Sequence, residues 1–227
     1  MIPSMVRNQI ESSLSAHKGR AAFAERLNAI TEDQGVFLFS DDLEGMFVLA
    51  ERYVRGTLHL MENCEIAAQQ ARVESMFDPL IDACGRFFLH SHPETPDQKG
   101  LLGMVCDSFL ARSLLAIASE RMQAVRGFPL LATNPHSEAQ VVRGLIGATL
   151  ADRLHQIAET AHDSPQIRFY TNSAYLLQGP LRASAALNEW GSAWEDDAIR
   201  FATSIGLKLD PVGRTSDPQP VARQIVL

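Results

Sequence analysis

The stretch that decides the fold is "TPDQKGLLGMVCDSFLARSLLAIASERMQAVRG", residues 95–127. It opens with a threonine that can cap a helix, a proline that suits the first helical position and a glutamine that can reach back to the cap. The spacing predicts a helix from residue 96 to about Arg126, with Gly127 as its stop. Apolar side chains cover nearly its whole circumference: Leu102, Val105, Phe109 and Ile117 on one side, Met104, Leu115 and Met122 on the other. Such a helix belongs in the centre of a bundle.

The same window is apolar enough to resemble a membrane span. It contains Asp107 and Arg112, each of which is costly near the middle of a bilayer, so a buried core helix is expected. The first twenty residues lack the apolar core of a secretion signal. These features predict a cytoplasmic protein with no membrane partner.

Composition excludes one further class of partner. The chain has 227 residues and a formal net charge of −7. Nucleic-acid phosphates call for basic patches, so no nucleic acid is expected as a partner. Cys64, Cys84 and Cys106 are odd in number and lack the spacing of a metal site, which predicts three reduced core thiols.

Helical periodicity recurs along the rest of the chain. Apolar residues spaced by three and four predict helices over about 41–73, 79–89, 135–162, 179–189 and 192–205. Strand signals are confined to 36–39 and 224–227. We therefore predict an all-α fold, a single-domain bundle of seven or eight helices over residues 1–207, followed by an extended C-terminal tail over 208–227.

The best functional lead is "LHQIAETAHD", residues 154–163. His155, Glu159 and His162 follow at spacings of four and three, which places them on one stripe of a helix. The two histidines lie about 10 Å apart along the axis at ~1.5 Å per residue. Metal–ligand bonds are only ~2 Å long, so two ions could share this stripe but one could not. The competing interpretation is a solvated polar face.

Three carboxylates on other helices bear on that choice. Glu65 falls on the apolar stripe of its helix, Glu62 lies on the flank of that stripe, and Glu120 continues the core stripe of the central helix. A buried carboxylate needs a partner, and a metal ion is one solution. A salt bridge from Glu65 to Arg143 or Arg153 is the alternative.

The segment His155-x3-Glu159-x2-His162 resembles the HxxxDxxH segment of the heme-oxygenase-like di-iron oxidases. The resemblance follows the helix order over about residues 41–205 and implies a heme-oxygenase-like fold. It also implies two iron ions held by ligands from an early, a middle and a late helix: Glu62, Glu65, Glu120, His155, Glu159 and His162. Glu159 stands where the family usually has aspartate, and the family's early-helix histidine is missing.

The sequence leaves open whether the chain is an enzyme. One hypothesis is a dinuclear iron oxygenase or oxidase that acts on a small organic substrate with O2. The other is a non-catalytic helical module that binds a small apolar ligand or a protein partner. A homodimer is left open.

A weaker alternative is a magnesium-dependent enzyme that resembles class I terpene synthases. It rests on Asp41-Asp42 together with Asn188, Ser192 and Asp196. Acids at positions 41 and 42 are also favourable at the helix N-terminus expected there.

Overall fold

The structure is a computed structural model that describes residues 4–15, 17–70, 74–90, 100–126, 139–167 and 196–207. Within these ranges regular structure is entirely helical, which confirms the all-α prediction. The main helices are α1 (Ser4–Ser15), α2 (His17–Asp33), α3 (Ser40–Gln70), α4 (Glu74–Leu89), α5 (Leu101–Arg126), α6 (Ala139–Ile146) and α7 (Ala148–His162). Residues 196–204 are also helical.

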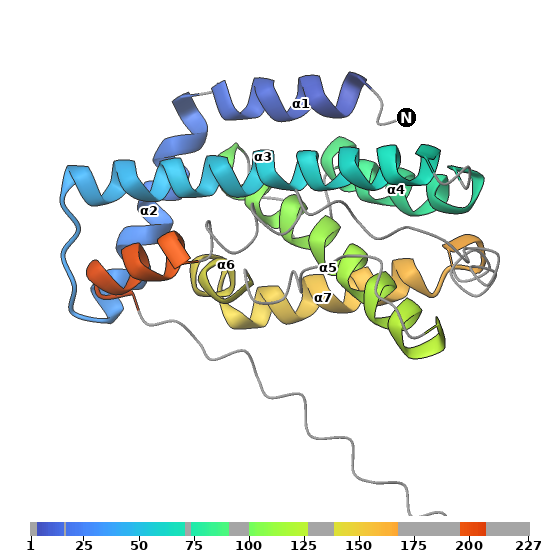
Figure 1. Ribbon diagram of the computed structural model, residues 1–227. Coiled ribbons are helices and arrows are strands. Elements are labelled where there is room, and N and C mark those ends of the chain that lie inside the picture. Colours follow the sequence, from blue (N-terminus) through green and yellow to red (C-terminus); the bar gives the residue numbers. More distant parts are fainter. Residues whose placement is uncertain are drawn as a thin grey trace, which may run out of the picture.

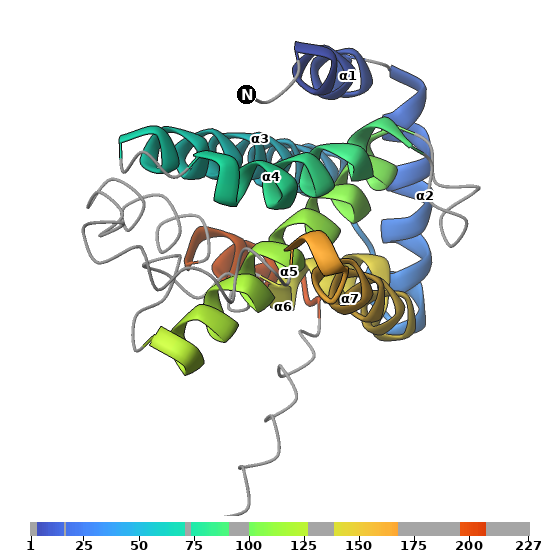
Figure 2. The same cartoon turned by 90° about the vertical axis from the view of Figure 1, so that its right-hand side faces the viewer.

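Helix α5 is the centre of the bundle, as predicted. It lies between a layer made of α3 and α4 and a second layer made of α6 and α7 (Figures 1 and 2). Helix α1 covers the outer side of the first layer, and α2 runs along one end of the bundle. Helix α5 contacts each of the other six.

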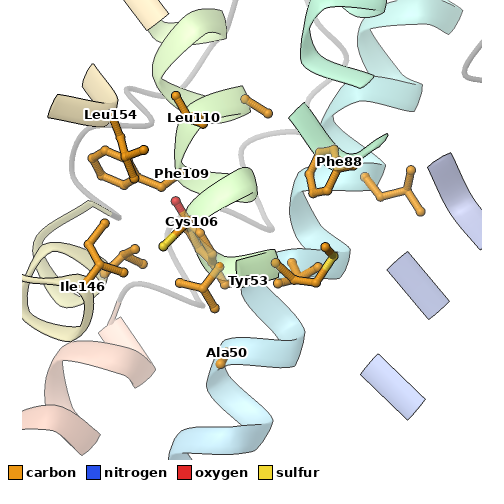
Figure 3. Packing of buried hydrophobic residues seen from close by; sticks show 14 of the residues in the cluster. Ala50, Tyr53, Phe88, Cys106, Phe109, Leu110, Ile146 and Leu154 are labelled. Carbon is orange, nitrogen blue, oxygen red and sulfur yellow. The ribbon is translucent and has the colours of Figure 1, made fainter. Parts of the chain in front are cut away.

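Apolar side chains from both layers meet on α5. Tyr53 of α3, Cys106 and Phe109 of α5, Ile146 of α6 and Leu154 of α7 point into one shared core (Figure 3). The described helices therefore bury a continuous hydrophobic cluster, and its removal from water is the main stabilising term in folding.

The stretch Leu101–Ala124 is long and apolar enough to cross a membrane, but its apolar window of 18 residues is entirely buried inside the bundle. The helix begins at Leu101, later than predicted, and residues 95–99 lie outside the described part. Gly100 adopts φ +76° and packs closely on Gly19 of α2: a Cβ on Gly19 would lie 2.7 Å from the backbone nitrogen of Leu101. Only glycine adopts this backbone conformation readily at such a close approach.

The helix expected over 135–162 is two helices in the part described, which begins at Ala139. The chain breaks at Gly147, whose φ is +89°, and α7 starts at the next residue. The Arg26 guanidinium of α2 donates a 3.3 Å hydrogen bond to the carbonyl oxygen of Ile146, at the end of α6. This bond satisfies one of the carbonyls that a helix end leaves without a partner.

The other predicted elements agree with the structure in some cases and differ from it in others. The predicted helix over 41–73 is α3, whereas α4 begins before Pro79 rather than at it. Residues 36–39 have no regular structure and are not a strand. The sequence did not locate α1 and α2. The predicted helix over 179–189, the tail 208–227 and the strand signal at 224–227 lie outside the described residues.

The three cysteines are buried and free, as predicted. Each lies on a different helix: Cys64 on α3, Cys84 on α4 and Cys106 on α5. Burial raises the pKa of the Cys64 thiol to about 12 and that of the other two still further. Thiols in this environment behave as small apolar side chains.

Candidate functional site

The predicted metal stripe lies on α7, and its residues differ in burial: His155 and Glu159 lie near the surface, whereas His162 lies in the core. The His155 side chain is 35% exposed and its Nε2 lies 3.9 Å from Oε1 of Glu159, which is more exposed. His162 is buried, and its Nδ1 lies 3.4 Å from Oδ1 of Asp163. That same oxygen lies 3.7 Å from the Arg121 guanidinium of α5.

Glu62 of α3 faces a different helix. Glu62 forms an ion pair with Arg7 of α1, and its second oxygen lies 3.3 Å from Nδ1 of His59. Glu65 is half-buried, with Oε1 inside the protein. These contacts tie Glu62 to the outer side of the α3–α4 layer, and α7 lies in the opposite layer (Figure 2).

Glu120 of α5 is exposed, although its helical stripe places it beyond Ser113 and Ile117, which are buried. Asp152, a candidate hydrogen-bond acceptor for a metal-bound histidine, forms instead a 2.8 Å salt bridge with Arg143 of α6.

Of the six proposed ligands, His155 and Glu159 lie within ion-pair distance of each other. Among the described residues, no three histidine, cysteine, aspartate or glutamate side chains are grouped so that they could hold a metal ion. Two irons would need several such ligands within ~2 Å of each ion. In the part of the chain that the structure describes, the six predicted ligands are therefore not brought together in one centre, and we derive no chemistry through a pair of irons.

A different site lies where α3 begins. Asp42 accepts a 2.9 Å hydrogen bond from the backbone N–H of Phe39 and so caps the turn that leads into the helix. The turn leaves two aromatic side chains in water: Phe37 is 85% exposed and Phe39 is 75% exposed. Val36 packs against Gly206, and this contact places the C-terminal end of helix 196–204 beside the turn.

Asp41, two residues after Phe39 in the sequence, is the first residue that lines a groove of about 470 Å³, which we call the acidic groove. Helix α3 forms one wall and helix 196–204 forms the other. Gly45 gives the groove its form, because a Cβ there would lie 2.2 Å from Cζ of Phe201. The groove is lined by Asp41, Glu44, Gly45, Val48, Leu49, Asp197 and Phe201.

Acidic side chains surround this apolar floor. Glu44 pairs with Arg20 of α2 at 3.2 Å, and Asp197 pairs with Arg200 at 3.1 Å. Asp41 is exposed and has no ion-pair partner in the part of the chain that the structure describes. The pKa of Arg20 is raised, chiefly because its guanidinium donates a hydrogen bond to Glu51.

Sequence reasoning missed the acidic groove. It interpreted the run at 36–39 as a strand signal and the acids at 41 and 42 as helix-terminal residues. The second interpretation is correct for Asp42. The signal available in the sequence was the pair Phe37 and Phe39 shortly before Asp41 and Asp42, because large apolar side chains are unusual in a loop exposed to water.

The described part is thus a helical bundle with an aromatic, acid-rimmed groove at one end. No family model, curated protein or solved structure matches this chain.

Proposed function

We propose that this protein is a non-catalytic helical module that binds a protein partner at the acidic groove. The observation that carries the proposal is the exposure of Phe37 and Phe39 directly before the helix whose first turns line a groove with an apolar floor. Soluble proteins rarely expose contiguous large apolar side chains except at interaction sites. Aromatic residues are enriched at the centres of protein–protein interfaces.

Photo-crosslinking tests this proposal directly. Benzoylphenylalanine in place of Phe39 should give a discrete protein adduct in an extract of the source cells. The same group in place of Met5, a 65% exposed side chain on α1, is the matched control and should not. Equal adducts from both positions, or none from position 39, would contradict a binding site at the groove.

The second candidate is the dinuclear iron oxygenase or oxidase with a heme-oxygenase-like fold and a small organic substrate. It is favoured by one observation, the buried His162 on the same stripe of α7 as the His155–Glu159 pair. Metal analysis of protein purified without a histidine tag tests it. Two irons per chain, lost in a His155→Ala variant, would support this candidate against the binding module.

A further inference from the structure

We infer that the occupant of the acidic groove is a helical segment of a partner protein with basic side chains beside an apolar face. The inference rests on the proposed function and adds the chemistry of the partner. It depends on the shape of the groove, on its apolar floor and on the charges at its rim.

The floor suits side chains presented by a helix. The groove lies between two helices, α3 and the helix 196–204. An amphipathic helix enters such a groove with apolar residues spaced by three and four. Phe201, Val48 and Leu49 offer the contacts inside the groove, and the exposed Phe39 lies two residues before Asp41 of the lining.

The rim selects the charge of the partner. Three carboxylates line the groove, namely Asp41, Glu44 and Asp197; Asp42 directly follows the first of them in the sequence, and Asp196 directly precedes the last. In the described part of the chain, three arginines pair with these lining carboxylates: Arg20 with Glu44, and Arg52 and Arg200 with Asp197. Together with Asp42 and Asp196, the acids of these two segments outnumber the three paired arginines, so lysine or arginine on the partner is attracted and an acidic partner is repelled.

A second copy of this chain fits the groove less well. A two-fold symmetric contact would place the same acidic rim of each copy opposite the other. The net charge of −7 adds to that repulsion. A small apolar ligand would leave Phe37 and Phe39 in water and the rim carboxylates without a role.

Selection from a random peptide library tests the inference. The full chain is presented to a phage library of peptides of ~15 residues, about four helical turns. Counter-selection uses the Phe37→Ser/Phe39→Ser double variant, whose two changes lie on the surface and whose circular dichroism should match that of wild type. We expect enriched peptides with apolar residues at helical spacing and a net positive charge.

Binding of an enriched peptide is then measured by fluorescence anisotropy. Phe39→Ser should weaken it about tenfold or more, as loss of an aromatic anchor does. Asp41→Asn should weaken it roughly two- to fivefold, and added salt should reduce that difference. Asp78→Asn, which removes an exposed acid on α4 far from the groove in sequence, is the matched control and should leave affinity unchanged.

Several results would overturn the inference. Enriched peptides that are acidic or neutral, no enrichment at all, or equal enrichment on the double variant would each do so. So would a peptide of residues 208–227 that binds the groove in place of the selected peptides, or a wild-type dimer that Phe39→Ser abolishes. If position 39 still gives a protein adduct in the crosslinking experiment, the groove binds a partner and only the inferred basic character of that partner is wrong. If position 39 gives no adduct, the proposed function fails as well.

Discussion

Asp107 should make the protein less stable as the pH rises from about 4 to about 8. The residue lies in the middle of α5 and is 8% exposed, between the fully buried Cys106 and Ser108. Burial removes water from its carboxyl group and raises its pKa to about 8. In the unfolded chain the same group ionises near pH ~3.9.

The sign follows from proton binding. Between these two pKa values the folded protein holds a proton on Asp107 that the unfolded chain has released. The free energy of unfolding therefore falls as pH rises, by at most about 1.4 kcal/mol per pH unit for one proton. This loss of stability is absent below the pKa of Asp107 in the unfolded chain and complete above its pKa in the folded protein. In both of these pH ranges the folded and unfolded states carry the same charge at residue 107.

Urea unfolding of wild type and Asp107→Asn at a series of pH values between ~4 and ~9 measures the effect. Asparagine keeps the shape of the side chain without its charge. The stability of the variant relative to wild type should increase across this range and then level off, while other titrating groups cancel in the difference. Asp78→Asn controls for the general loss of one negative charge. A difference between Asp107→Asn and wild type that is constant with pH would refute the reasoning.

Three further predictions concern packing. Gly19→Ala should destabilise the fold by about 1–3 kcal/mol, because the new Cβ would meet the backbone of α5 at 2.7 Å. Gly85→Ala, whose Cβ would meet its nearest neighbour at 3.4 Å, should be neutral or stabilising, and equal losses from both variants in urea unfolding would contradict this. Thr57→Val should lose roughly 1–3 kcal/mol, since Oγ1 of Thr57 accepts a 2.7 Å hydrogen bond from the buried Arg112. Thr160→Val removes a hydrogen bond that an exposed threonine donates to the carbonyl oxygen of Gln156 and should change stability by less than about 0.5 kcal/mol, so similar losses at both sites would count against the buried pair. The three cysteines should react with a thiol reagent only after denaturation, and rapid reaction in the native protein would show that they are accessible.

The parts of the fold that the sequence predicted are those that periodicity determines. Helices α3 and α5 are long, and their apolar residues recur over many turns, so each was placed to within a few residues. The break at Gly147 was missed because a glycine within a helical pattern is usually tolerated. At this break Arg26, from a helix far away in sequence, donates a hydrogen bond to the carbonyl oxygen of Ile146.

The acidic groove could not have been assembled from the sequence for the same reason. Its walls come from α3 and from helix 196–204, and its form depends on Gly45 lying opposite Phe201. Periodicity assigns each residue to a face of its own helix, but it does not say which other helix lies against that face. Pairing of distant elements is a property of the packed bundle.

The predicted metal stripe illustrates how far helical spacing can be used. His155 and His162 share one stripe of α7, yet the first is half-buried and the second is buried. Helix α5 crosses α7 at an angle, so the neighbours of the stripe change along its length (Figure 1). At the His162 end the side chain that α5 supplies is Arg121, which shares an oxygen of Asp163 with the histidine. A guanidinium at this point repels a metal cation, whereas Glu120, the carboxylate that the hypothesis required, is exposed one residue away. Spacing placed two histidines on one stripe, but the crossing of α5 over α7 decides which side chains of α5 each of them meets.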